Sequence, residues 1–270
     1  MKALITGASS GIGRDIARYL SKLGYDLVIV ARRKENLEIL KKELNTNVEI
    51  VCLDVSEKEN CIKLFEEHKD IDILVNNAGF GLFGHFDSTD LEKELSMIDT
   101  NVVAVHILTK LYVQEMEKRD SGYILNVASI AGFMAGPLMA TYYATKNYVV
   151  SLSRAIRKEL KKEINKFIDS IKDIDMKELK KEKSNVKISV LCPGPVKTEF
   201  NDVAGVRFCI RGVTSKYVAK YAIDKMLKGK EIILPSFTIK CVKFLSKISP
   251  DNLVTEVSYH TQKSKDKKEK

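Results

Sequence analysis

The sequence has few cysteines, and nothing in their arrangement builds a disulfide framework or a zinc site. Its five cysteines are an odd number and none belongs to a Cys-x-x-Cys pair. Cys52 and Cys192 lie in apolar runs, where a free thiol behaves as a small buried hydrophobe. The four histidines also lack the spacing of metal ligands. We therefore expect reduced thiols and no bound metal.

Long apolar runs and an N-terminal leader are missing as well. No apolar run approaches the ~18 residues of a membrane span, and Met1-Lys2 leads directly into a strand-like run, with no room for a signal peptide. The net charge of +9 arises from 45 basic and 36 acidic residues, without the basic stripe and interleaved aromatics of a nucleic-acid binder. These absences predict a cytoplasmic protein that binds no nucleic acid and has a lysine-rich surface.

What the chain does contain is a regular alternation of apolar strand-like runs and helical patterns. At 270 residues and 44% apolar, it can bury a full core. The predicted strands are Lys2–Thr6, Asp26–Ala31, Val48–Leu53, Ile71–Val75, Gly122–Ser129 and Val186–Cys192. Leu91–Arg119 is predicted as one long helical region with Asn101 in its middle. This order predicts an α/β fold, a Rossmann-type doubly wound parallel sheet with ligands at the carboxyl ends of its strands.

Two of the expected strand ends have the composition of a dinucleotide site. Thr6–Gly13 places Gly-x-x-x-Gly-x-Gly between a strand and a helix, where glycines allow a backbone to approach a pyrophosphate at a helix N-terminus. The second strand ends in Arg32 and Arg33 rather than in an acidic residue. Arginine there accommodates a 2′-phosphate, so we expect NADP(H) in preference to NAD(H); a solvated pair of loop arginines is the alternative.

The fifth strand leads to a candidate catalytic group. Tyr142 and Lys146 are four residues apart, so on a helix they share a face. A cation held near a phenol lowers its pKa from ~10 and makes tyrosine usable as a general acid or base. Ser129, at the end of the strand, can donate a hydrogen bond to the substrate oxygen or to the phenol. By itself Tyr-x-x-x-Lys is a weak motif, and its meaning depends on what precedes it.

Together these motifs resemble the classical short-chain dehydrogenase/reductase family over roughly residues 1–235. The glycine loop, Asp54-Val55, Asn76–Gly79, Asn101, Ser129, the Tyr-x-x-x-Lys pair and Pro193–Thr198 stand in the family's order and spacing. The resemblance implies a cofactor site formed by Gly7, Ser9, Ser10, Gly11, Ile12, Gly13, Arg32, Arg33, Asp54, Val55, Asn77, Ala78, Gly79, Tyr142, Lys146, Pro193, Gly194, Val196 and Thr198.

The resemblance also implies roles for single residues. Asn101, Ser129, Tyr142 and Lys146 would form the catalytic tetrad. Tyr142 would exchange a proton with the substrate oxygen, which Ser129 would orient, while Lys146 would bind the nicotinamide ribose and lower the pKa of Tyr142. Asn101 would hold a water in a proton relay.

A second group of implied roles concerns the cofactor and the sheet. Asp54 would contact the adenine, Thr198 would hold the nicotinamide carboxamide, and Asn76 would stabilise the central sheet. Tyr143 is a rival proton donor, but its spacing to Lys146 is wrong.

Two regions depart from the family pattern. An insert at about 161–185 carries apolar residues at roughly helical spacing; it is either a solvated surface segment or an oligomer or lipid contact. A C-terminal extension, 236–261, has apolar residues interrupted by lysines. It either packs on the core, closes over an apolar substrate, or lies as a basic amphipathic helix on a membrane surface. We expect residues 262–270 to form a disordered charged tail.

The expected activity is reversible NADP(H)-dependent reduction of a ketone or aldehyde to an alcohol by hydride transfer, in a homodimer or homotetramer. A mobile lid is expected over Phe200–Gly212. An apolar pocket, which favours a hydrophobic substrate, is expected from Phe80, Leu82, Phe83, Phe133, Met134 and Met139. A 3-oxoacyl thioester reductase and a hydroxysteroid dehydrogenase are alternatives within this enzyme class. A non-catalytic nucleotide sensor would be of a different class.

Overall fold

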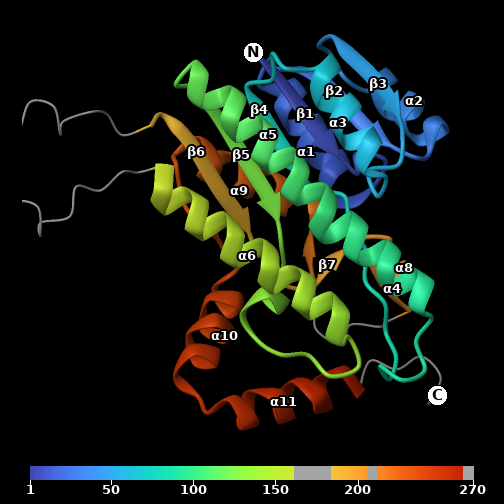
Figure 1. Cartoon of the computed structure of the whole chain (residues 1–270), viewed down its shortest axis with the longest axis vertical. Coiled ribbons are helices and arrows are strands. Elements are labelled where there is room, and N and C mark those ends of the chain that lie inside the picture. Colours follow the sequence, from blue (N-terminus) through green and yellow to red (C-terminus); the bar gives the residue numbers. More distant parts are fainter. Residues whose placement is uncertain (161–183, 206–211, 264–270) are drawn as a thin grey trace, which may run out of the picture.

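A parallel sheet of seven strands forms the centre of the molecule (Figure 1). The computed structural model describes residues 1–160, 184–205 and 212–263. The strand order is β3-β2-β1-β4-β5-β6-β9, and each pair of neighbours runs parallel. The strands are β1 Lys2–Thr6, β2 Asp26–Ala31, β3 Val48–Cys52, β4 Ile73–Asn76, β5 Gly122–Val127, β6 Val186–Leu191 and β9 Ile232–Ile233. A separate pair joins β7 (Val196–Lys197) to β8 (Val213–Thr214).

Helices cover both faces of this sheet (Figure 1). On one face, α1, α2 and α9 bury side chains such as Ile16, Leu37 and Ile223 against the strands. On the other, α3 and α5 bury Leu64 and Leu108, with α6 beside β6. The helices are α1 Gly11–Lys22, α2 Lys34–Lys42, α3 Lys58–Glu67, α4 Leu91–Ile98, α5 Ala104–Lys118, α6 Ala140–Leu160, α8 Phe200–Ala204, α9 Ser215–Leu227, α10 Phe237–Ile248 and α11 Asp251–Lys263. The predicted doubly wound α/β fold is confirmed.

The order of strands fixes where a ligand can bind. Strand order runs outward from β1 in both directions, toward β2 and β3 on one side and toward β4 and β5 on the other. The chain therefore leaves β1 and β4 to opposite faces, and a crevice opens at their carboxyl ends. At this point the Thr6 hydroxyl donates to the Val75 carbonyl (3.4 Å) and accepts from the backbone N–H of Asn77 (3.0 Å).

Two details differ from the expectations. The region 91–119 is two α-helices joined by a π-helical turn, Asp99–Val103, that contains Asn101. The last helix continues to Lys263 with Gln262 buried, so the expected start of a disordered tail at 262 is wrong. The insert at about 161–185 lies almost wholly outside the described residues, as do residues 264–270.

A buried polar network ties β4, β5, α5 and α6 together beneath the crevice. Asn126 accepts from the Asn76 amide (2.9 Å) and the Thr109 hydroxyl (3.3 Å), and it donates to the Ser153 hydroxyl (3.0 Å). All four side chains are almost fully buried. Buried polar groups that keep their partners rigidify a core, whereas a lost partner leaves costly orphans.

Replacing Asn126 by alanine should therefore lower the free energy of unfolding by about 1–3 kcal/mol, because Asn76 and Ser153 lose partners in a dry environment. Urea denaturation of the Asn126→Ala variant measures this. The exposed Asn45→Ala variant serves as control and should change stability by no more than ~0.5 kcal/mol. Equal stability of the two variants would contradict the importance of the network.

Candidate active site

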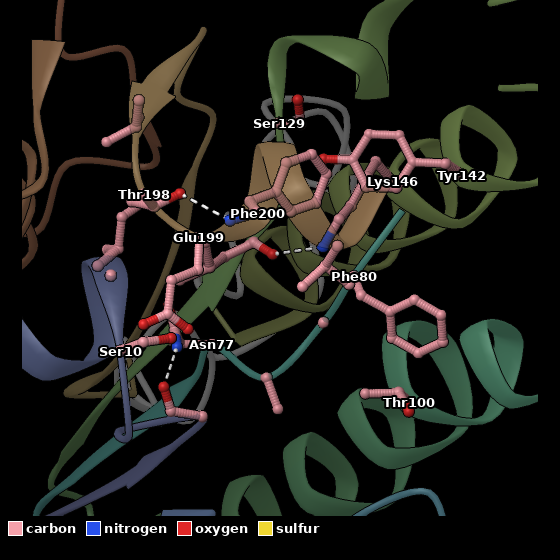
Figure 2. Close-up of a pocket in the computed structure, with 18 of the residues that line it drawn as sticks. Ser10, Asn77, Phe80, Thr100, Ser129, Tyr142, Lys146, Thr198, Glu199 and Phe200 are labelled. Atoms are coloured by element: carbon pink, nitrogen blue, oxygen red, sulfur yellow. Dashed lines mark hydrogen bonds between the residues drawn. The ribbon is translucent and has the colours of Figure 1, made fainter. Parts of the chain in front are cut away.

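A cavity of about 590 Å³ lies at the carboxyl ends of the strands. Of the residues predicted for the cofactor and the chemistry, all line it except Gly13 and Asn101. Figure 2 shows its side chains, with Tyr142 and Lys146 at one end and Ser10 and Glu199 toward the other. The fold therefore places residues from segments between positions 7 and 198 of the chain around one cavity.

The loop between β1 and α1 is shaped for a close approach of a phosphate. Gly7 and Gly11 have φ of +66° and +56°, a region that suits glycine. A Cβ on Gly7 would lie 2.8 Å from the Ala78 Cα. α1 begins at Gly11 with no acidic residue in its first turn, so its free N–H groups and dipole favour an anion.

Gly13 has a different role from the one the resemblance implied. A Cβ there would lie 2.3 Å from Asn77 Nδ2 and 2.5 Å from the Gly7 carbonyl oxygen. The Asn77 amide donates to the carbonyls of Thr6 (3.0 Å) and Gly7 (3.1 Å). Gly13 thus leaves the space that this amide needs to hold the loop in shape, and it acts from beneath the cavity.

The outer end of the cavity is charged and exposed. Arg32 pairs with Asp54 (3.2 Å), and Arg33 contacts the Ser9 hydroxyl (3.2 Å) and pairs with Glu199 (2.9 Å). Burial alone would raise the pKa of Asp54, but hydrogen bonds from Ser56 and Arg32 outweigh it and the pKa is lowered. Asp54 therefore carries a negative charge at neutral pH.

The inner end holds the Tyr142–Lys146 pair on the first turns of α6. The Lys146 ammonium donates to the Val127 carbonyl at the end of β5 (3.1 Å) and lies 5.8 Å from the centre of the Tyr142 ring. Lys146 is only 5% exposed. Burial lowers its pKa to about 8, because a charged amine loses hydration there.

The pKa of Tyr142 differs from the expectation. Burial raises it above its ordinary value, and the hydrogen bond with the Ser129 hydroxyl opposes this without reversing it. In the protein alone, Lys146 does not lower the phenol's pKa. Tyr142 is therefore protonated at neutral pH, which is the state that a proton donor needs.

Asn101 acts behind the cavity wall. Its amide donates to the Phe80 carbonyl (2.9 Å) and the Thr145 hydroxyl (3.1 Å), and its oxygen accepts from the Phe80 N–H (3.1 Å). The π turn widens the helix at this residue, a distortion often found at functional sites. The structure gives Asn101 a positioning contact between the loop after β4 and α6, and its water-holding role stays a prediction.

The wall near Tyr142 is largely apolar. Phe80, Met139, Phe200 and Val203 line it, and the Phe200 ring lies 5.4 Å from that of Tyr142. Leu82 and Phe83 pack in the same cluster. Phe133 packs elsewhere, with Val149 and Val190. Of the six residues expected at the mouth, only Phe80 and Met139 line the cavity, so the expectation is wrong for Leu82, Phe83, Phe133 and Met134. Of the expected lid, the structure describes Phe200–Gly205 and Gly212.

Residues that sequence reasoning missed also face the cavity. Gln262 comes from α11, is 2% exposed, and donates to the Tyr143 hydroxyl. Glu199 lies beside Arg33. The helical spacing of Leu253, Val254 and Val257 could have extended α11 toward Gln262, but no local pattern brings that helix to Tyr143.

Neither a metal nor a membrane span is indicated in the part of the chain that the structure describes. It holds no group of three or more His, Cys, Asp or Glu side chains placed to bind a metal ion. None of its helices combines the length and hydropathy that crossing a bilayer requires.

Comparison with known proteins agrees with this geometry. Residues 1–205 match the family model for short chain dehydrogenases, and the chain belongs to this family of oxidoreductases. An uncharacterized oxidoreductase of Staphylococcus epidermidis is 35% identical over 162 residues, 58% of this chain and 70% of that protein. The 3-oxoacyl-[acyl-carrier-protein] reductase of Rickettsia prowazekii is 35% identical over 161 residues, 58% of this chain and 66% of that protein.

Solved structures share the fold over nearly the whole chain. A short-chain dehydrogenase from Sphingobium yanoikuyae in complex with NADPH superposes with a TM-score of 0.74 at 24% identity, covering 92% of this chain and 96% of that one. A family member from Burkholderia phymatum in complex with NAD has a TM-score of 0.74 at 23% identity, covering 90% and 92%.

The burial of Lys146 generates a prediction about pH. Between about pH 8 and pH 10.5 the unfolded chain keeps a proton that folded Lys146 has released. This residue's contribution to the free energy of unfolding therefore rises with pH in that window. Urea denaturation at several pH values should show wild type gaining stability relative to Lys146→Met as pH rises. A stability difference that stays flat across the window would contradict the lowered pKa.

Proposed function

We propose that this protein is an NADP(H)-dependent reductase that converts a ketone or aldehyde of a hydrophobic substrate to an alcohol, reversibly. One observation supports the proposal above the others. A buried, protonated Tyr142 phenol and the Lys146 amine lie at the inner end of a cavity whose outer end has the glycine loop and two arginines. A cavity with a proton donor at one end and anion-binding groups at the other fits a dinucleotide reductase.

The chain's own residues supply proton transfer and orientation. Tyr142 donates its phenolic proton to the carbonyl oxygen of the substrate during reduction and recovers one from the alcohol during oxidation. Ser129 donates a hydrogen bond to the same oxygen and so orients it. Bound cofactor supplies the hydride. The apolar wall near Tyr142 lowers the local dielectric, and donor hydrogen bonds in such a medium stabilise developing charge more strongly than in water.

Residues at both ends of the cavity support NADP(H) as the cofactor. The N–H groups at the start of α1 and the glycine loop would hold the pyrophosphate, and Arg32 and Arg33 the 2′-phosphate. Lys146 would contact the nicotinamide ribose and Thr198 the carboxamide. The NADPH complex of the Sphingobium relative is in keeping with this choice, whereas the NAD complex of the Burkholderia relative shows that the fold also accepts NAD.

The substrate class follows from the wall around Tyr142. Phe80, Met139 and Phe200 favour an apolar ketone, aldehyde or acyl chain over a sugar. A 3-oxoacyl thioester is an alternative supported by the likeness to the Rickettsia reductase, and a steroid ketone is another. A nucleotide-sensing protein without activity has no chemical use for Ser129, Tyr142 and Lys146 together. We also propose a homodimer or homotetramer in the cytoplasm.

Replacing Tyr142 by phenylalanine should reduce turnover by about 100- to 10,000-fold, because the proton donor is lost while the ring still fills its place. NADPH binding should remain. The assay follows NADPH and NADH oxidation with a panel of apolar ketones, aldehydes, steroid ketones and 3-oxoacyl thioesters.

The Tyr143→Phe variant is the matched control, since Tyr143 lies next in the chain and its hydroxyl is bound to Gln262. It should keep most of the wild-type rate. If Tyr142→Phe were as active as wild type, or if Tyr143→Phe alone were inactive, the assignment of the proton donor would be wrong.

A further inference from the structure

An ion pair crosses the outer end of the cavity between two distant segments. Arg33 follows β2 and Glu199 precedes α8, yet Arg33 Nη1 lies 2.9 Å from Glu199 Oε2. The other guanidinium nitrogens, Nε and Nη2, face the Ser9 hydroxyl at 3.4 and 3.2 Å. Both members of the pair line the cavity and are about half exposed. Figure 2 shows the Glu199 side chain on the same side of the cavity as Ser10 and Asn77.

This pair matters because Arg33 is one of the two groups assigned to the 2′-phosphate. A guanidinium binds a phosphate through the same fork of N–H donors that binds a carboxylate. Glu199 therefore competes for Arg33, and its negative charge also repels the phosphate dianion. A ribose 2′-hydroxyl has no charge to repel and no need of the guanidinium.

We propose that Glu199 sets the cofactor selectivity of this enzyme by weakening NADP(H) relative to NAD(H), and that a 2′-phosphate displaces it from Arg33. The inference rests on the proposed function. Glu199 also connects the two ends of the cavity, because it directly precedes Phe200, whose ring packs near Tyr142.

The test measures binding and needs no turnover. Dissociation constants of NADPH and NADH are determined by nicotinamide fluorescence titration for wild type and Glu199→Gln. NADPH should bind about three- to fivefold more tightly to the variant, the range of an exposed ion pair, and NADH should change by less than about twofold. Glu117→Gln on α5 removes the same charge away from the cavity and should change neither constant.

A double variant identifies the partner of Glu199. In an Arg33→Gln background, Glu199→Gln should lose most of its effect on NADPH, because the two residues act through one contact. The inference would be overturned if Glu199→Gln changed the dissociation constants of NADPH and NADH equally, or changed neither. It would also be overturned if the tighter binding of NADPH were unchanged in the Arg33→Gln background, or if wild type bound neither cofactor. Binding with the expected shifts but no turnover on any carbonyl would overturn only the proposed function.

A second, independent observation concerns α10, which presents its apolar side outward. Ile239 is buried against Gly194, whereas Phe237, Phe244 and Ile248 are 79%, 63% and 62% exposed. At ~100° per residue these three lie within about 40° of each other and opposite Ile239. Leu253 of α11 is also exposed. We call Phe237, Phe244, Leu245, Ile248, Leu253 and Val257 the α10–α11 face.

The charges beside this face favour one partner. α10 has three lysines and no acidic residue, and Lys240 and Lys247 are exposed along one edge of the apolar strip. α11 adds the exposed Asp251 and Glu256, of which Glu256 lies 2.9 Å from His260, and lysines outnumber carboxylates on the two helices. An apolar strip flanked by lysines is the pattern of a helix that lies in the surface of an anionic bilayer. A second copy docked by a two-fold axis with antiparallel α10 helices would instead bring two lysine rows together.

We infer that the α10–α11 face binds the surface of an anionic membrane. α10 and α11 extend from one end of the sheet (Figure 1), beside the end of the cavity that Gln262 lines. A protein held in this way would take an apolar substrate from the lipid phase next to its pocket.

Flotation of the full chain with vesicles tests this. Protein should float with phosphatidylcholine vesicles that contain phosphatidylglycerol, much less with phosphatidylcholine alone, and less at high salt. The Phe244→Ser/Ile248→Ser variant should lose flotation. The Ile39→Ser/Ile62→Ser variant, with two exposed apolar residues of α2 and α3 replaced, should keep it. The inference would be overturned if wild type did not float or if the two variants floated equally. It would also be overturned if, without vesicles, the Phe244→Ser/Ile248→Ser variant had a lower sedimentation mass than wild type.

Discussion

The burial of the Lys146 amine against the end of β5 is the constraint on which the site depends. A cation this far from water is unfavourable unless a polar group receives it, and the Val127 carbonyl is that group. The contact fixes the first turns of α6 over the sheet. A Cβ on Gly79 would lie 2.7 Å from the Asn101 side-chain oxygen and 3.3 Å from the amine, so glycine in the loop after β4 leaves room for both groups.

The same helix turn is held from its other side by Asn101. Its amide joins the Phe80 backbone to Thr145, and the Thr145 hydroxyl donates to the Tyr142 carbonyl (2.7 Å). Two helices and two loops thus determine where the Tyr142 phenol points. A proton donor must be held to within a fraction of an ångström of its acceptor, and a network of buried hydrogen bonds achieves this more reliably than exposed contacts.

How far sequence could predict this structure depends on the range of the interactions. Apolar runs predicted the six principal strands because the burial of each strand is evident from the apolar residues that it contains. The glycine loop and the Tyr-x-x-x-Lys pair were found for the same reason: their chemistry depends on local spacing. The π turn at Asn101 was missed, and the hydrogen bond that Asn101 makes there is to Phe80, 21 residues away in the chain. Glu199 and Gln262 lie 166 and 119 residues from their partners, and no local pattern reports such pairs.

The two ends of the cavity also differ in how strongly their contacts can act. At the inner end, burial lowers the pKa of Lys146 to about 8 and raises that of Tyr142, so the protonation state of each group depends on how dry its surroundings are. At the outer end, Arg32, Arg33 and Glu199 are roughly half exposed or more, and water and salt weaken each charge. Under the proposed function, selectivity between two cofactors would therefore change by small steps at the outer end while the proton chemistry at the inner end stayed the same. Arg33 and Glu199 are half exposed and pack against little of the core, whereas Lys146 is buried beneath the reacting end of the cavity.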